Sequence, residues 1–341
     1  MRIGKARVTA AEVAKQAGVS QPTVSLVLTR NPKARVAPET RARILKIAEE
    51  LGYRPNRLAQ GLVHRRSFAL GIIVPGLSNP VYVNIISGAE RVAADAGYAV
   101  LLCETGHVDA LQHLEALRDR QIDGVIIAGV AASTLPPAAL EQLNVVLINQ
   151  PSARFTTVGG DSLKAGALAG EHLLTLGHKR LAFIGPATSN WAFQMRERGF
   201  VQSLRAAGIS LHSDQLRRAP ATIGGGLAAM RALLALPSRP TAVFCANDLL
   251  ALGAHKACAA AAVALPRDLS ILGCDDIEMD TLVTPELTTI STPQRELGAR
   301  AARLLLKHIE GGESLPLVAQ SLPVKLVPRG TTGPAPRESG A

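Results

Sequence analysis

The chain has 341 residues, enough for two or three compact units. Its net charge of +10 comes from the first fifth of the chain, because residues 1–66 hold fourteen Lys or Arg and four Asp or Glu while the rest is balanced. A basic segment before a neutral body indicates a module that binds a polyanion, since phosphate neutralisation supplies most non-specific affinity for nucleic acid. From charge alone, a solvated basic tail is the alternative.

The cysteines Cys103, Cys245, Cys258 and Cys274 are scattered, with no C-x-x-C pair and no nearby His at ligand spacing. This pattern argues against a zinc site and against a disulfide framework. The N-terminus lacks an apolar signal core, and the longest apolar run, Ala257–Leu265, is too short to span a bilayer. We therefore expect a cytoplasmic protein with no metal and no cofactor.

The first sixty residues predict three short helices. Thr9 and Glu12 form a capping box for a helix that Gly18 ends, because glycine readily adopts the left-handed conformation. A third helix follows Pro38 and stops at Gly52. Its predicted buried stripe is Ile44, Ile47, Ala48 and Leu51.

The second helix carries the face that we expect to read DNA. Ser20 is a good N-cap, and Pro22 is tolerated in the first turn because those N–H groups have no partner within the helix. Val24, Val27 and Leu28 recur at helical spacing and should face the core. Two short helices joined by a glycine turn, with an uncharged outer face on the second, predict a helix-turn-helix. That outer face consists of Gln21, Pro22, Ser25 and Leu26.

From residue 68 the pattern changes to β-rich runs that alternate with amphipathic helices near 80–96, 109–120 and 136–143. Two series of buried runs indicate two doubly wound parallel α/β units in tandem. The fold class is therefore α/β, with an all-α helix-turn-helix domain in front of a two-lobed body that resembles periplasmic binding proteins. The predicted strands are 68–75, 98–103, 124–129, 145–149, 180–185, 241–247 and 269–276.

Ligands of such sheets bind at the carboxyl ends of the strands, which here means the cleft between the lobes. No strand is followed by a phosphate-binding glycine motif, so nucleotide binding is disfavoured. Amides, carboxylates and an arginine in the cleft suit a hydroxyl-rich ligand. Trp191 is expected to stack on a sugar ring, and ordinary packing is the alternative. The polar strand ends are 78–80, 149–150, 247–248 and 275–276.

The chain is expected to return to the first lobe near Thr292, where an amphipathic helix begins, and to form one more strand around 317–326. Crossings near Asp161, Thr292 and Leu322 would make a three-stranded hinge, through which ligand could close the cleft. The tail from residue 331 is rich in Gly, Pro and Ser and is predicted to be disordered.

VTAAEVAKQAGVSQPTVSLVL and PETRARILKIAEELGYRPNRLAQGL resemble the DNA-binding domain and hinge of the LacI/GalR family of bacterial regulators, and the resemblance continues to about residue 330. It implies that Gln21, Pro22 and Leu26 read bases. The family often has Arg at the position of Leu26 and Asn at that of Thr29; leucine packs on a thymine methyl and makes no bidentate guanine contact. The remaining DNA-binding positions are Ser20, Thr23, Ser25, Thr29, Tyr53, Asn56 and Leu62.

The hinge over residues 56–66 resembles the family segment that becomes helical on DNA and inserts a leucine into the minor groove, here Leu62. Gln60 and Gly61 replace the usual Arg and Ser, and glycine costs about 1 kcal/mol of helix propensity. A plain flexible linker is the alternative.

The resemblance also assigns effector-binding residues. MRERGF makes Arg196 the cationic clamp, while CAND and GCDD bring Asn247 and Asp275 to the effector. Asn247 could instead only cap the following helix. Cys274 stands where an aromatic residue is usual, and Ala221 lies near a position that is aromatic in some relatives. The full predicted set is Asn79, Tyr82, Asn149, Trp191, Arg196, Asn247 and Asp275.

These patterns predict a homodimeric, or larger, repressor that binds double-stranded operator DNA at the nucleoid under control of a carbohydrate effector. A solute-binding protein for transport is the alternative, and an enzyme is disfavoured because no G-x-S-x-G elbow or metal-ligand cluster is present. The predicted domains are 1–55, the hinge 56–66, the body 67–330 and the tail 331–341. Lobe 1 should take about 67–161 and 293–321, and lobe 2 about 162–292 and 322–330.

Overall fold

The computed structural model describes residues 8–28, 36–53, 66–106, 108–130, 134–187, 190–312 and 315–337. The chain divides into two compact units, an N-terminal unit, Met1–Phe68, and a body, Ala69–Ala341. Within the described segments, no helix is both long and apolar enough for a membrane crossing.

The N-terminal unit contains the three predicted helices, α1 (Ala10–Ala17), α2 (Gln21–Leu28) and α3 (Pro38–Glu50). The capping box is confirmed: the Thr9 backbone N–H donates to the Glu12 carboxylate at 2.6 Å, and the Glu12 N–H donates to the Thr9 hydroxyl at 3.3 Å. Gly18 follows α1 with φ 64°, as its role at the helix end requires. The shared core consists of Val13, Ala14, Ala17, Val24, Val27, Ile44 and Ala48, with Ile47 and Leu51 partly buried at its edge.

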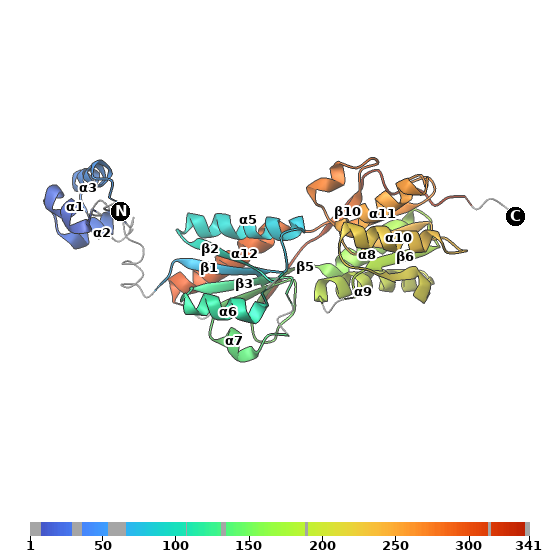
Figure 1. Ribbon diagram of the computed structural model, residues 1–341, viewed down its shortest axis with the longest axis horizontal. Coiled ribbons are helices and arrows are strands. Elements are labelled where there is room, and N and C mark those ends of the chain that lie inside the picture. Colours follow the sequence, from blue (N-terminus) through green and yellow to red (C-terminus); the bar gives the residue numbers. More distant parts are fainter. Residues whose placement is uncertain are drawn as a thin grey trace, which may run out of the picture. The chain divides into compact units, whose positions relative to one another are not determined.

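Lobe 1 of the body is built on a parallel six-stranded sheet in the order β11-β5-β4-β3-β1-β2. Helices α5 and α12 pack against each other on one face, and α6 and α7 cover the other (Figure 1). The strands are β1 (Ala69–Val74), β2 (Ala99–Glu104), β3 (Gly124–Ala128), β4 (Val145–Ile148), β5 (Thr156–Gly160) and β11 (Ala319–Leu322). The helices are α5 (Pro80–Asp95), α6 (Ala110–Asp119), α7 (Pro137–Glu141) and α12 (Gln294–Gly311).

Lobe 2 repeats this plan with the order β12-β10-β9-β8-β6-β7, in which only β12 runs antiparallel to its neighbour. Phe183, Phe200 and Phe244 pack together in its core with ring centroids 5.1–6.1 Å apart. The strands are β6 (Leu181–Gly185), β7 (Leu216–Arg218), β8 (Ala242–Cys245), β9 (Ser270–Asp275), β10 (Thr288–Ser291) and β12 (Lys325–Val327). The helices are α8 (Ser162–Thr175), α9 (Trp191–Ala206), α10 (Ile223–Leu234) and α11 (Asp248–Ala260).

The chain passes between the lobes after β5, after β10 and after β11. The first and third passages are joined, because the Asp161 N–H donates to the Leu322 carbonyl at 3.0 Å. The single strand expected over 317–326 is two strands, β11 and β12, which belong to different sheets and flank Pro323. Proline has no N–H for a ladder, and this favours a break there.

The prediction of a disordered tail from residue 331 is wrong for 331–337. The Thr331 side chain is fully buried and donates to the Ile271 carbonyl at 2.7 Å, and the Ala335 N–H donates to the Leu176 carbonyl at 2.8 Å. The imidazole of His178 lies 3.1 Å from the Gly333 carbonyl. Small polar residues leave no hydrophobic pattern in this segment, yet they hydrogen-bond to the start of β9 and to the end of α8 in lobe 2.

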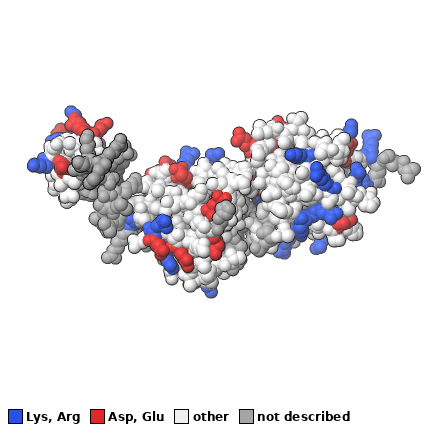
Figure 2. Space-filling model, in the orientation of Figure 1, with Lys and Arg blue, Asp and Glu red and all other residues white. Residues whose placement is uncertain are grey.

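The visible face of lobe 1 carries acidic and basic side chains near one another, whereas that of lobe 2 carries more basic than acidic ones (Figure 2). Over the whole chain after residue 66 the charges balance. The excess positive charge of the chain therefore lies in the N-terminal unit.

Candidate reading helix and effector cleft

Helix α2 presents an uncharged outer face. Ser20 caps the helix, because its hydroxyl accepts the Thr23 N–H at 3.3 Å and lies 2.8 Å from the Thr23 hydroxyl. Val24 and Val27 are buried, and the side chain of Leu26 is 39% exposed. The other exposed positions of this face are Gln21, Pro22 and Ser25. Of the remaining predicted DNA-binding residues, Thr29, Asn56 and Leu62 lie outside the described residues.

Tyr53 follows α3 and is half-buried against the helical core. Its backbone N–H donates to the Ala48 carbonyl at 2.8 Å, which fixes the chain just after Gly52 turns with φ 63°. Tyr53 therefore has a structural role at the end of α3.

A pocket between the lobes brings together five of the seven predicted effector residues. Lobe 1 supplies three of them and lobe 2 supplies two, and each follows the carboxyl end of a strand or lies in the helix that follows it. The five are Asn79, Tyr82, Asn149, Arg196 and Asp275. An adjoining cleft of about 520 Å³ shares Tyr82, Gly129, Asn190 and Phe193 with this pocket.

Arg196 and Asp275 form a buried ion pair in this pocket. The Arg196 Nη2 donates to Asp275 Oδ1 at 2.8 Å, and its Nη1 donates to the Ala246 carbonyl at 2.6 Å. Burial raises the pKa of Asp275 to about 7, while the arginine opposes this shift. Burial also disfavours the charge of Arg196, but the facing carboxylate outweighs it and raises the pKa of the guanidinium. Among the described residues, no acceptor faces the Arg196 Nε.

Asp275 has φ 142°, a conformation that side chains rarely adopt and that costs about 1–3 kcal/mol. Asp248 holds the loop in place: its carboxylate accepts the N–H of Asp276 at 2.6 Å and that of Ile277 at 3.2 Å. Burial, followed by the nearby Asp248, raises the pKa of Asp280 to about 10, so that Asp280 stays protonated at neutral pH. Asp248 is thus a support for the clamp.

Asn247 is fully buried and caps α11, with its Oδ1 accepting the Leu250 N–H at 3.0 Å. It does not line the pocket as the structure has it. Its Nδ2 finds no acceptor among the described residues. Asn247 therefore does cap α11, and its side-chain N–H donor is the group that remains without an acceptor among the described residues.

Tyr82 and Asn149 face the pocket from lobe 1. Burial raises the pKa of Tyr82 to about 12, and the Asp275 charge adds to this shift. The tyrosine hydroxyl lies against Gly129, where a Cβ atom would come within 2.2 Å of it. Asn149 adopts φ 58° and its Oδ1 accepts the Gly160 N–H at 2.9 Å, which leaves the amide nitrogen as its spare donor.

Trp191, which was expected to stack on a sugar ring, is the first residue of α9 and does not line the pocket. Phe193, two residues further along α9, does, and its ring centroid lies 5.6 Å from the Arg196 guanidinium carbon. Asn190, which caps α9 by accepting the Ala192 N–H at 3.1 Å, also lines it. Helical spacing was the missed signal: Phe193 and Arg196 are three residues apart and share a face.

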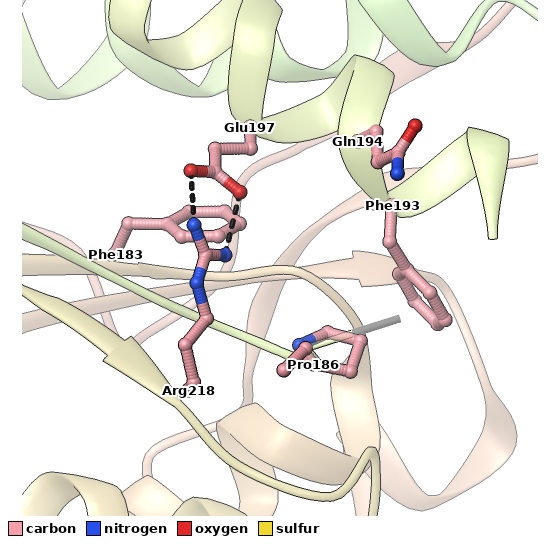
Figure 3. A pocket seen from close by; sticks show the side chains of 7 residues that line it. Phe183, Pro186, Phe193, Gln194, Glu197 and Arg218 are labelled. Carbon is pink, nitrogen blue, oxygen red and sulfur yellow. Dashed lines mark hydrogen bonds and ion pairs between the residues drawn. The ribbon is translucent and has the colours of Figure 1, made fainter. Parts of the chain in front are cut away.

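A side pocket of about 150 Å³ opens beside Phe193 (Figure 3). Both Nη atoms of Arg218 donate to the Glu197 carboxylate at 2.6 Å, and this pair closes one side of the pocket (Figure 3). Arg218 also lines the larger cleft. The pairing of Glu197 with Arg218 leaves Asp275 as the carboxylate partner of Arg196.

Comparison with known proteins identifies both parts of the chain. Residues 9–56 match the bacterial regulatory proteins of the lacI family, and residues 171–332 match a periplasmic binding protein-like domain. The HTH-type transcriptional repressor CytR of Escherichia coli (strain K12) is 35% identical over 337 residues, covering 96% of this chain and 97% of that protein. The chain belongs to the lacI family.

Solved structures of family members have the same fold. The lac repressor dimer bound to operator and the anti-inducer ONPF matches with a TM-score of 0.82 and 29% identity, covering 96% of this chain and all of that one. A complex of the transcriptional regulator CelR with cellobiose matches with a TM-score of 0.73 and 27% identity, covering 95% and 100% of the two chains. Membership of the lacI family makes this protein a DNA-binding transcriptional regulator, rather than a transport protein or an enzyme.

Proposed function

We propose that this regulator is a homodimeric repressor whose affinity for operator DNA is set by a sugar or sugar derivative bound between its lobes. The observation that carries the proposal is the buried Arg196–Asp275 pair at the cleft. Unsatisfied buried donors are costly, and a ligand oxygen would satisfy the spare Nε of Arg196.

The chemistry of the pocket favours a ligand with several hydroxyl groups, because each buried hydroxyl needs a donor and an acceptor. Asp275 accepts, Arg196 donates, and Asn79 and Asn149 bring amides. Phe193 offers an apolar face for a sugar ring, a role that it takes over from Trp191 in this proposal. The cellobiose bound to CelR is a ligand of this class.

We propose that α2 reads the operator through Gln21, Pro22 and Leu26. The exposure of Leu26 supports its contact with a thymine methyl. The same proposal puts Thr23, Ser25, Tyr53 and Asn56 near the phosphates, and it makes Leu62 the minor-groove wedge. Two half-sites are needed because one such module buries little surface, which supports a homodimer working on DNA in the cytoplasm.

The proposal is tested by screening the full-length chain against monosaccharides, disaccharides, ribonucleosides and amino acids in thermal melts. A ligand at about 100 times its Kd stabilises the folded state by about 2.7 kcal/mol. Each compound that stabilises the protein is then added to a complex of the protein with DNA selected from a random pool. We expect a sugar or a glycoside to change the DNA affinity. Binding of an amino acid with no binding of any sugar or glycoside would overturn the effector class, and failure to select any DNA would overturn the reading face.

A further inference from the structure

A pair of side-chain amides links the two lobes behind the effector pocket. Asn84 lies on α5, and Gln294 is the first residue of α12 after the second passage between the lobes. The Asn84 Nδ2 donates to the Gln294 Oε1 at 2.8 Å, and the Gln294 Nε2 donates to the backbone carbonyl of Asp275 at 2.5 Å. Gln294 is only 5% exposed, so that water competes little for these bonds.

The hydrogen-bond partners fix which end of each side-chain amide is the nitrogen and which is the oxygen. A backbone carbonyl can only accept, so the Gln294 nitrogen must face Asp275 and its oxygen must face Asn84. That oxygen in turn requires the Asn84 nitrogen. Each amide therefore has one productive orientation, and loss of either one leaves the other with an unmatched group.

The lobe 1 end of this bridge is rigid. A Cβ at Gly88 of α5 would lie 1.9 Å from the Arg295 carbonyl, and one at Gly298 of α12 would lie 1.8 Å from the Ile85 carbonyl. The two helices are thus in backbone contact and move as one body. The other end is the Asp275 backbone in its rarely adopted conformation, and it belongs to the residue whose carboxylate lines the pocket.

We propose that Asn84 and Gln294 are positioning residues that transmit occupation of the Arg196–Asp275 clamp to the α5–α12 pair of lobe 1. The inference rests on the proposed function, since it takes that clamp as the effector site. Helix α5 also bears Tyr82 and is capped by Asn79, so a ligand in the pocket touches the same helix that the bridge holds from behind. Ligand and bridge therefore act on one equilibrium, which makes their effects non-additive.

Hydrogen exchange of the full-length chain tests the bridge without any ligand. The variants are Asn84→Leu and Gln294→Met, with Gln294→Glu as a conservative change that keeps the acceptor for Asn84 and removes the donor to Asp275. We expect all three to accelerate exchange of the Asp276 and Ile277 amides on the order of tenfold, the effect of losing one buried hydrogen bond. The decisive variant is Asn84→Leu, because its side chain lies in lobe 1 and the amides that respond lie in lobe 2.

The matched control is Asn144→Leu. Asn144 also joins two parts of lobe 1 by donating to the Asp123 carbonyl at 2.8 Å, and its oxygen lies 2.8 Å from the His308 imidazole of α12. Neither Asn144 nor its partners Asp123 and His308 line the pocket. This control should leave exchange at residues 276 and 277 unchanged. Equal acceleration in the control, or exchange at the wild-type rate in Asn84→Leu, would overturn the inference.

A second arm measures transmission with D-ribose and cellobiose as probes. For a probe that shifts the DNA affinity of the wild type, Asn84→Leu should bind it within about tenfold of the wild-type Kd and lose most of the shift, since coupling is a quantity separate from affinity. An undiminished shift would overturn the inference. If neither probe binds the wild type, the result counts against the proposed effector class. The hydrogen-exchange experiment then still tests whether Asn84 and Gln294 couple the two lobes.

Discussion

The two lobes have nearly the same topology but bring different chemistry to the cleft. Lobe 1 contributes Asn79, Tyr82 and Asn149, which are uncharged at neutral pH and partly exposed. Lobe 2 contributes a buried ion pair, Arg196 and Asp275, whose side chains are 6% and 5% exposed. The ionic half of the site is already desolvated, whereas the amides of the neutral half, Asn79 and Asn149, are partly exposed.

This difference assigns different tasks to the lobes. Desolvating two charges costs several kcal/mol per ion, and in lobe 2 that cost is met during folding. Asp248 holds the acidic loop through two backbone N–H groups, so that the clamp is preorganised. Neutral amides lose less on burial than charged groups do, so closure of lobe 1 over a ligand would cost less desolvation free energy. We therefore expect lobe 2 to orient the effector and lobe 1 to respond to it.

The largest expected effect comes from Arg196→Met. It leaves the Asp275 carboxylate buried without its cation and should lower the free energy of unfolding by about 3–5 kcal/mol, and abolish effector binding. Denaturant melts measure the stability. The control is Arg218→Met, whose exposed pair with Glu197 should contribute less than about 1 kcal/mol. Similar losses of unfolding free energy in the two variants would show that the buried pair stabilises lobe 2 no more than the exposed pair does.

Gly129→Ala should perturb lobe 1 by a smaller amount. Gly129 has φ 73°, and the new methyl group would lie 2.2 Å from the Tyr82 hydroxyl, so we expect about 1–3 kcal/mol of strain and a displaced Tyr82. The control is Gly224→Ala in the first turn of α10, where a Cβ meets nothing closer than 3.9 Å. That change should be neutral or stabilising by up to about 1 kcal/mol. Wild-type effector affinity in Gly129→Ala would remove Tyr82 from the site.

A buried histidine should add its own pH dependence to the stability of lobe 2. His178 lies 3.0 Å from the Thr241 hydroxyl and 3.1 Å from the Gly333 carbonyl, and burial lowers its pKa. A histidine whose pKa falls on folding binds fewer protons in the folded state, so its own contribution to stability is lost as pH falls below about 6.5. Asp275 and Asp280, whose pKa values burial raises, contribute with the opposite sign, so the histidine is isolated by comparing the wild type with His178→Gln. The two should differ in the slope of stability against pH by up to about 1.4 kcal/mol per pH unit, whereas the exposed His212→Gln should keep the wild-type slope. An unchanged slope in His178→Gln would contradict this origin.

The contrast between the lobes also shows what the sequence could predict. Caps were predictable because Thr9 and Glu12 form their bonds within four residues. Arg196 and Asp275 were each named, but their bond spans 79 positions and no local pattern encodes it. The strands β5, β7 and β10 were missed because threonine, glycine and arginine leave no hydrophobic run there. The Arg329 side chain donates to residues 42 and 53 positions earlier in the chain, which is why the segment after it was predicted to be disordered.

The smallest expected effect comes from Asn79 of lobe 1, where it separates helix capping from ligand binding. Asn79 caps α5, with its Oδ1 accepting the Val81 N–H at 3.1 Å, and its amide nitrogen is the group available to a ligand. Asn79→Ala removes both functions and should cost about 1 kcal/mol of stability. Asn79→Asp keeps the cap acceptor and gains about 0.3–1 kcal/mol from its charge at the helix N-terminus. If Asn79 binds the effector, Asn79→Asp should weaken sugar binding by about tenfold, or about 1.4 kcal/mol, at undiminished stability. If it is only a cap, titration calorimetry will give the wild-type affinity, and the neutral half of the site reduces to Tyr82 and Asn149.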